Sequence, residues 1–514
     1  MTATQYAPNG MVCSADRLAS SAGVAALRAG GSAVDAAIAA NAVLAVTAPH
    51  LCGLGGDLFA LVHDGDGPPA ALNSSGRAGS GADPAALRAE GHASMPLFGD
   101  IRTVTVPGCV DGWFALHERY GKLPLTELFA EAVGYAEKGF PASPLLAGAV
   151  ERIAANPDAR DLTAASKPGA PVRRPGVGRT LRAIAEGGRD AFYGGEFGAG
   201  LLRMGGGLFS SEDLAGPVAD WTEPLRVAAL GHDVWTIGAS SQGYLLLLAL
   251  AVADGLDVPA DPDDAGWAHL LVEAARVAGH DRPSVLHEDA DLAALLAPGH
   301  VAERRAAIAP DRRLDVRDLT GDGDTTYLCA VDGDGMGVSL IQSNASGFGS
   351  GLFEAATGIG LHNRGLGFNL LDGHPAEFRP GRRPPHTLAP ALVTRPDGSL
   401  RAVTGTMGGD TQPQILLQLL TRLLRDGQSP GAAMRAPRWR VGNVTGFDTW
   451  ADADAPIELE EAAPVSWDGL AERGHRVVRT AATYGHAQLI EVREDGTRAG
   501  ASDPRAVVGG AVGH

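Results

Sequence analysis

The chain has 514 residues, 45% of them apolar and 20% charged, and its 60 acidic against 42 basic residues leave a formal net charge of −18. This composition is typical of a folded, acidic, soluble protein, and it argues against a nucleic-acid partner, because phosphate binding needs clustered Lys and Arg. The longest apolar run, residues 244–253, is shorter than the roughly 20 residues that span a bilayer. We therefore expect neither a nucleic-acid partner nor a membrane partner.

The cysteines lie far apart and form no C-x-x-C pair, which argues against a zinc site and against a disulfide framework. They are Cys13, Cys52, Cys109 and Cys329. We expect buried thiols in a reducing compartment. The first 14 residues lack the basic and apolar stretches of a secretory signal. The sequence thus predicts a cytoplasmic protein, and it predicts no metal and no cofactor.

The first part of the chain is predicted to be rich in helix. Residues 20–48 indicate two Ala-rich helices separated at Gly30 and Gly31, and Ser32 caps the second helix with Asp35 completing a capping box. Further helices are expected at 110–140 and within 145–230, together with a strand at 58–63, a strand at 233–237 and an apolar helix at 244–253.

After about residue 320 the pattern changes to short strands with small polar turns. Strands are expected at 326–331, 336–342, 358–362, 475–479 and 486–492, and a hairpin at 391–394 and 401–406. Pro413 in a first turn and apolar residues at i, i+4 spacing predict a helix over 412–425. This part therefore predicts layered sheet with helices packed outside.

Several common functional motifs are not supported. Asp332 and Asp334 resemble the start of a calcium loop, but no Glu follows at the required position, and Asp-Gly pairs are ordinary turn formers. The glycines of 347–351 lack the Lys of a phosphate-binding loop. The chain has no G-x-S-x-G elbow and no H-E-x-x-H, which argues against a serine hydrolase or a zinc protease of those types.

One segment combines a Gly- and Asp-rich stretch with two adjacent threonines. In residues 321–332, Thr325 and Thr326 begin an apolar strand. Taken alone, this is an ordinary strand that starts with β-branched residues. Three further segments follow downstream, at 339–351, 380–390 and 405–410. In this order and spacing the segments resemble the γ-glutamyltransferase family, whose precursor cleaves itself before a Thr that then becomes an N-terminal nucleophile.

The resemblance covers nearly the whole chain, with shorter family landmarks at 30–37, 53–56, 106–108, 120–124, 192–194, 212–214 and 240–243. It implies an α+β fold, the four-layer αββα sandwich of N-terminal-nucleophile hydrolases, and self-cleavage between Asp324 and Thr325. It also implies a helix-rich large subunit of 1–324 and a small subunit of 325–514, which come from one precursor and form one intertwined unit. A homodimer of the processed heterodimer stays open.

The implied chemistry suits the residue types. Cleavage would expose the α-amine of Thr325, whose unperturbed pKa of about 7.7–8 lets it act as general base for its own hydroxyl. The backbone N–H groups of Gly408 and Gly409 match the family's oxyanion hole, and Ser343 lies where the family keeps a hydroxyl near the nucleophile. Ser343 as a solvent-facing strand residue stays an alternative. The resemblance further implies substrate contacts from Arg77, Asn344, Asn363, Arg364, His386 and Thr387.

The substrate positions depart from the γ-glutamyl pattern. Arg364 and Gly367 stand where that pattern has Gln and Asp, and His386 and Thr387 replace its paired serines. Arg77 is displaced by about two positions from the Arg that grips the substrate α-carboxylate. The pocket has lost its ammonium acceptor, and its two arginines favour an anionic amide, since guanidinium binds carboxylate bidentately. Arg364 as a partner in a structural ion pair stays equally open.

The sequence therefore predicts a self-processing amidohydrolase similar to γ-glutamyltransferases and glutathione hydrolases, which hydrolyses or transfers the acyl group of a small amide through an acyl-Thr intermediate. The altered substrate positions resemble the divergent branch of the family that contains oxamate amidohydrolases and cephalosporin acylase-like proteins. The acyl group is expected to be γ-glutamyl, or the substrate is an anionic amide of the oxamate type or an acylase substrate. A second alternative is an unprocessed homologue that acts as a binding protein, because Tyr327 and Cys329 replace the usual His and Ser after the threonine pair.

Overall fold

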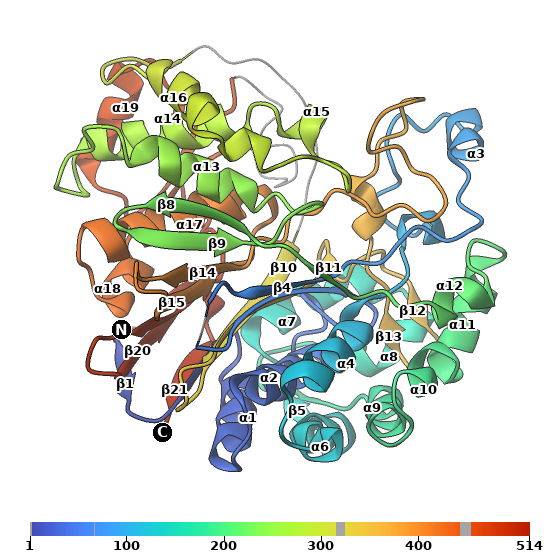
Figure 1. Cartoon of the computed structure of the whole chain (residues 1–514). Helices are drawn as coiled ribbons and strands as arrows, with labels where there is room; N and C mark the ends of the chain where they lie inside the picture. The colour runs from blue at the N-terminus through green and yellow to red at the C-terminus, as the bar shows by residue number, and fades with distance from the viewer. Residues whose placement is uncertain (1–2, 66, 315–323, 443–453) are drawn as a thin grey trace.

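Two seven-stranded antiparallel sheets pack face to face at the centre of the computed structural model, which describes residues 3–65, 67–314 and 324–442 together with 454–514, and of Asp324 only the backbone (Figure 1). Sheet A runs in the order β1 (Gln5–Ala7), β20 (Arg498–Ser502), β19 (Gln488–Val492), β15 (Leu400–Gly405), β14 (Ala391–Thr394), β9 (His232–Thr236), β8 (Leu225–Ala229). Sheet B runs in the order β21 (Gly510–Gly513), β2 (Met11–Ser14), β10 (Asp324–Val331), β11 (Gly337–Ala345), β3 (Asp57–His63), β4 (Ala70–Ser74), β7 (Asp220–Thr222).

The space between the sheets is filled by alternate residues of the strands. Successive side chains of a strand point to opposite faces, so each central strand gives one row to the other sheet and one row to the helices. In β10, Tyr327 and Cys329 belong to the core between the sheets. Leu328 and Ala330 belong to the core beneath the helices. Thr325 shares the row of Tyr327 and Cys329, and it therefore faces the space between the sheets.

Helices cover both outer faces (Figure 1). Sheet B is covered by α1 (Arg17–Arg28), α2 (Ala33–Thr47) and α4 (Cys109–Tyr120), with α6 (Ala130–Lys138) and α9 (Pro175–Gly187) outside them. Sheet A is covered by α13 (Tyr244–Ala253), α17 (Gln412–Leu420) and α18 (Pro430–Arg435), with α14 (Ala265–Gly279), α16 (Pro298–Ala306) and α19 (Gly469–Glu472) outside them. The predicted α+β fold with four αββα layers is confirmed.

Smaller elements complete the molecule. The short helices are α3 (Pro84–Ala89), α5 (Leu125–Leu128), α7 (Pro144–Ala149), α8 (Arg160–Thr163), α10 (Asp190–Tyr193), α11 (Glu196–Gly205), α12 (Ser211–Ala215) and α15 (Arg282–Val285). The minor sheets pair β5 (Phe140–Pro141) with β6 (Pro171–Val172), β12 (Phe353–Glu354) with β13 (Ile359–Gly360), and β16 (Trp439–Val441) with β17 (Ile457–Glu460) and β18 (Val477–Thr480).

Each main sheet takes strands from both sides of the peptide bond between residues 324 and 325. In sheet B, β10 lies between β2 and β11, and Cys329 pairs with Cys13 of β2. In sheet A, β14 pairs with β9. The C-terminal β21 pairs with β2, and the Asn9 N–H donates to the His514 carbonyl at 2.9 Å. The segments 1–324 and 325–514 therefore share both sheets, while a division of the chain at that bond stays a prediction.

Most predicted elements occur where the sequence placed them. Ser32 caps α2, accepting from the Asp35 N–H at 3.1 Å, while the Asp35 carboxylate accepts from the Ser32 N–H at 2.9 Å. The helix expected over 412–425 is α-helical only to Leu420 and continues as a π-turn, where the Thr421 hydroxyl donates to the Leu417 carbonyl at 2.7 Å. The strand expected at 358–362 is reduced to β13, because the chain then turns toward the site described below.

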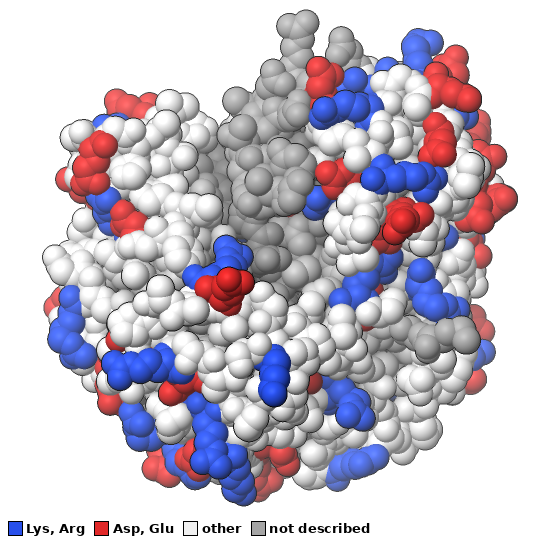
Figure 2. Space-filling view, turned by 180° about the vertical axis from the view of Figure 1, so that it is seen from behind, with Lys and Arg blue, Asp and Glu red and all other residues white. Residues whose placement is uncertain are grey.

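All four cysteines are buried free thiols, as the sequence predicts. Among the described residues, no helix combines the length and the apolar character needed to cross a membrane. Figure 2 shows acidic and basic side chains intermingled over the described part of one face of the molecule.

Candidate functional site

The predicted nucleophile lies where three strands of sheet B end together. Thr325 follows the first residue of β10, Ser343 lies near the end of β11, and Asp57 begins β3. Because the strands are antiparallel, these positions meet at one edge, and Ser343 pairs directly with Asp57. All three side chains are fully buried. A set of hydroxyl and charged groups is therefore concentrated at this end of the space between the sheets.

The two hydroxyls are in contact. Thr325 Oγ1 lies 3.0 Å from Ser343 Oγ. Ser343 Oγ also accepts from the Ala345 N–H at 2.8 Å and from Arg364 Nη2 at 3.1 Å. A serine hydroxyl has two lone pairs and one hydrogen. Since two N–H donors occupy the lone pairs, the hydrogen of Ser343 is free of these two contacts, and Thr325 Oγ1 is one acceptor within reach.

Arg364 connects the hydroxyl pair to a buried carboxylate. It lies in a short 3-10 turn, Arg364–Gly367, and is 2% exposed. Its Nη1 donates to Thr387 Oγ1 at 3.2 Å, and its Nε lies 3.3 Å from Asp57 Oδ2. Of the two interpretations that the sequence left open for Arg364, the ion pair is therefore present, and the same guanidinium also reaches Ser343.

Two histidines flank the same carboxylate. His386 Nε2 lies 3.0 Å from Asp57 Oδ2, and the Leu388 N–H donates to His386 Nδ1 at 3.2 Å, so Nε2 carries the proton and donates to Asp57. His362 Nδ1 lies 3.5 Å from Asp57 Oδ2 but accepts from the Arg364 N–H at 3.3 Å. Burial lowers the pKa of His386 to about 3 and lowers that of His362 as well. Both rings are therefore neutral at physiological pH.

Charge balance at the site rests on Asp57 and Arg364. Burial by itself would raise the pKa of Asp57, but the neighbouring His362, the hydrogen bond from His386 and the charge of Arg364 hold it at about 2. Burial lowers the pKa of Arg364 to about 10, partly offset by Asp57. With both histidines neutral, Arg364 is the cation that compensates the carboxylate at neutral pH.

The predicted oxyanion-binding glycines lie in a tight turn between β15 and α17. Gly408 and Gly409 have φ values of 128° and 54°, which favour glycine. Within the described residues neither backbone N–H donates a hydrogen bond to another group. The buried Gln242 amide donates to the carbonyls of Gly409 at 2.9 Å and Thr387 at 3.0 Å. Gln242 therefore joins this turn to the segment that carries Thr387 and His386.

The remaining predicted substrate residues are placed differently. The Asn344 amide donates to the Pro49 carbonyl at 3.1 Å. The Asn363 amide donates to the Leu97 carbonyl at 2.8 Å. Both side chains therefore hold loops around the site. Arg77 is 43% exposed and donates to Glu288 and to the Gly381 carbonyl, both at 2.9 Å, and it makes no contact with the cluster around Asp57.

Sequence reasoning missed Asp57, His362 and Gln242 as site residues. Gln242 stands in the landmark 240–243, Asp57 directly follows the landmark 53–56, and His362 directly precedes Asn363. A lone Asp, His or Gln in such a stretch gives no chemical signal by itself. His50 is a further buried polar residue that the sequence did not single out. It is 6% exposed, both of its ring nitrogens lack a hydrogen-bond partner among the described residues, and burial lowers its pKa to about 3.

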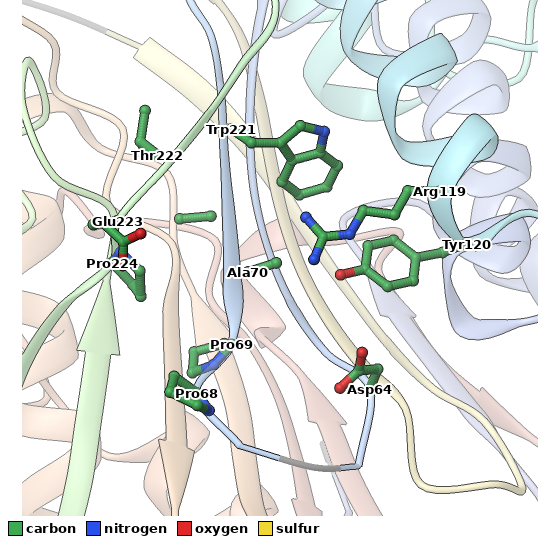
Figure 3. Close-up of a pocket in the computed structure, with 11 residues that line it drawn as sticks. Asp64, Pro68, Pro69, Ala70, Arg119, Tyr120, Trp221, Thr222, Glu223 and Pro224 are labelled. Atoms are coloured by element: carbon green, nitrogen blue, oxygen red, sulfur yellow. The ribbon is translucent and has the colours of Figure 1, made fainter.

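The open pocket in Figure 3 lies elsewhere, at the β7 edge of sheet B. The Arg119 guanidinium lies 5.0 Å from the centre of the Tyr120 ring and 4.6 Å from that of Trp221. None of the predicted site residues lines this pocket of about 390 Å³.

Comparison with known proteins agrees with the fold. The γ-glutamyltranspeptidase family profile matches residues 19–513. The oxamate amidohydrolase proenzyme of Klebsiella pneumoniae subsp. pneumoniae is 35% identical over 529 residues, which cover 98% of each chain. The glutathione hydrolase-like YwrD proenzyme of Bacillus subtilis is 34% identical, covering 96% of this chain and 97% of the relative.

Among solved structures, the cephalosporin acylase from Bacillus halodurans superposes with a TM-score of 0.91 at 33% identity, covering 100% of this chain and 97% of the acylase. The agreement spans both sheets and all four layers. The chain belongs to the γ-glutamyltranspeptidase family and is an enzyme with the N-terminal-nucleophile hydrolase fold.

Proposed function

We propose that the protein is a self-processing amidohydrolase in which Thr325, freed by cleavage after Asp324, attacks the carbonyl of a small anionic amide. The observation that carries this proposal is the contact of Thr325 Oγ1 with Ser343 Oγ at 3.0 Å, buried at the edge of the space between the sheets. The oxamate amidohydrolase and YwrD relatives are both proenzymes, which supports processing of this chain as well.

Self-cleavage would proceed by an acyl shift. Thr325 Oγ1 attacks the carbonyl carbon of Asp324, the C–N bond breaks, and the nitrogen of Thr325 takes up the hydroxyl proton, which leaves an ester between the two residues. Water then hydrolyses the ester, giving a carboxylate on Asp324 and the free hydroxyl of Thr325 with a free α-amine. A hydrogen bond donated by Ser343 would stabilise the charge that develops on Thr325 Oγ1.

The same groups would serve the substrate. The α-amine of Thr325 would take the hydroxyl proton while Oγ1 bonds to the amide carbon. The N–H groups of Gly408 and Gly409, which have no hydrogen-bond acceptor among the described residues, would bind the developing oxyanion. The proton then passes to the leaving amine as the C–N bond breaks. Water hydrolyses the acyl ester with the same amine as base, and the acid product leaves with the enzyme restored.

The residues at positions 364 and 367 favour a short anionic acyl group over a γ-glutamyl group. A γ-glutamyl donor carries an α-ammonium group, which γ-glutamyl enzymes hold with an acid at the position of Gly367. Here a Cβ at 367 would clash with the Pro385 carbonyl, so an acidic side chain has no room. The loss of this acceptor argues against an amino-bearing acyl group.

Arg364 offers a carboxylate site close to the nucleophile. Since 3.0 Å separates Thr325 Oγ1 from Ser343 Oγ and 3.1 Å separates Ser343 Oγ from Arg364 Nη2, the guanidinium lies within 6.1 Å of the reacting oxygen. A guanidinium has five N–H donors, of which one on Nη1 donates to Thr387, one on Nη2 donates to Ser343, and the one on Nε lies beside Asp57. The second hydrogens of Nη1 and Nη2 would bind a carboxylate next to the scissile carbonyl, as in oxamate. Hydrolysis or transfer of a γ-glutamyl group is the second candidate, supported by the family match.

A denaturing gel and a substrate panel test the proposal. The purified chain should give fragments of roughly 33 and 19 kDa, in proportion to 324 and 190 of its 514 residues and 52.6 kDa, and the smaller should begin at Thr325. Thr325→Ala should stay at full length. Processed enzyme should hydrolyse oxamate faster than the neutral oxamide or a γ-glutamyl anilide. An intact wild-type chain would refute the nucleophile, and anilide release without oxamate turnover would refute the substrate class.

A further inference from the structure

Asp57 is the centre on which four separate segments meet. It begins β3, and its Oδ1 accepts from the Gly76 N–H at 3.3 Å in the loop after β4. Its Oδ2 accepts from His386 Nε2 at 3.0 Å and lies 3.3 Å from Arg364 Nε. Both of the positions that replace γ-glutamyl residues with basic ones, 364 and 386, therefore touch the same carboxylate.

This carboxylate determines where the Arg364 guanidinium can lie. Arg364 is 2% exposed, and a buried guanidinium without a counter-charge costs several kcal/mol, so its position depends on the nearest anion. Asp57 is itself fixed, because two N–H donors and the pairing of its backbone with Ser343 hold it in place. Arg364 then spans the short distance from Asp57 to the Ser343 hydroxyl.

We infer that Asp57 is a positioning residue for the proposed reaction, on which this inference rests: it holds Arg364 so that Nη2 donates to Ser343 Oγ, and Ser343 in turn presents its hydrogen to Thr325 Oγ1. The chain of contacts acts on the nucleophile, and therefore on the chemical step of both self-cleavage and turnover. It does not require Asp57 to touch the substrate.

A positioning role of Asp57 can be distinguished from a purely electrostatic effect of its charge on substrate binding. Replacing Asp57 with Asn removes a negative charge 3.3 Å from Arg364, which by itself would strengthen binding of an anionic substrate. Loss of positioning would instead slow the chemical step. The effect on substrate binding changes KM, whereas the effect on the chemical step changes kcat.

The experiment compares the full-length wild type with Asp57→Asn, Arg364→Gln and the double variant. The double variant removes both buried charges together, so its folded state contains no unpaired buried charge at this place. Asp111→Asn is the matched control. Asp111 is 6% exposed, pairs with Arg189 and accepts from the Val218 N–H at 2.6 Å, and neither partner belongs to the cluster around Asp57. For each chain, the self-cleavage rate constant, kcat and KM for oxamate, and the thermal unfolding midpoint are measured.

We expect Asp57→Asn to lower the self-cleavage rate constant and kcat by about ten-fold or more, with KM unchanged or lower. The double variant should match Arg364→Gln within about three-fold, because Asp57 acts through Arg364. Asp111→Asn should keep both rates even if it lowers the unfolding midpoint. Wild-type rates in Asp57→Asn, or effects of the two single variants that multiply, would overturn the inference. An uncleaved wild type would instead overturn the proposed function.

Discussion

Replacing Ser343 with Ala tests the hydroxyl next to the nucleophile. The change removes the acceptor of the Ala345 N–H at 2.8 Å and of Arg364 Nη2 at 3.1 Å, together with the contact to Thr325 Oγ1 at 3.0 Å. Two buried donors lose their partner, each at a cost of about 1–3 kcal/mol, so the free energy of unfolding should fall by roughly 2–6 kcal/mol. Loss of one hydrogen bond to Thr325 should slow self-cleavage by about 10–100-fold.

Ser339 provides a matched control on the same face of β11. Its hydroxyl lies 2.8 Å from the Tyr327 hydroxyl and donates to the Thr404 carbonyl at 3.3 Å, also fully buried. Ser339→Ala should lower stability by about 1–3 kcal/mol and leave self-cleavage at the wild-type rate. Ser343→Thr restores a hydroxyl and should recover most of the rate.

The assay follows the disappearance of full-length precursor on a denaturing gel, with urea unfolding of the same samples. Equal self-cleavage rates for Ser343→Ala and Ser339→Ala, at equal loss of stability, would show that the hydroxyl of Ser343 has only a structural role. The contact between Thr325 and Ser343 would then no longer support the proposed mechanism.

Gly408→Ala should lower kcat by about 10²–10³-fold with little change in secondary structure by circular dichroism, because a side chain disfavours the φ of 128° that aims the N–H; an unchanged kcat would exclude this oxyanion hole. Gly367→Asp should not create γ-glutamyl anilide hydrolysis, because the new side chain clashes with the neighbouring carbonyl; a gain of that activity would show that the site has room for an ammonium acceptor. Burial lowers the pKa of His50, His386 and His475 to about 3, so the folded protein keeps them neutral while the unfolded chain takes up protons below pH 6.5. Stability should therefore be complete above pH 6.5 and fall by about 1.4 kcal/mol per pH unit for each ring down to about pH 3; a thermal midpoint that stays constant from pH 6.5 to 5 would contradict this.

Local sequence signals predicted local structure well. The box formed by Ser32 and Asp35 and the apolar run of 244–253 occur as expected, because capping and helical periodicity depend on neighbouring residues only. The π-turn after Leu420 was not foreseen, since it reflects a side-chain bond of Thr421 that competes with the regular helix.

Site residues could be predicted where a short sequence motif by itself indicates the reaction, as the two adjacent threonines do. Thr325 and Ser343 are eighteen residues apart in adjacent strands, and the structure brings them into contact. Asp57 could not be found in this way, because its meaning depends on the register of β3 against β11 and on a residue more than 300 positions away. Arg77 illustrates the opposite mistake. Its position close to that of a family arginine suggested substrate binding, but the fold places its side chain beside Glu288 at the surface.

The pairing of β21 with β2 brings the start and the end of the described chain together, as Figure 1 also shows. A circular permutant is therefore feasible, in which a short linker joins His514 to the first strand and the gene is reopened between codons 324 and 325. Removal of the initiator Met would then deliver Thr325 with a free amine straight from translation. Such a protein would need no self-cleavage, so its turnover would report on catalysis alone, and the maturation of the natural chain could be varied without changing the enzyme that results.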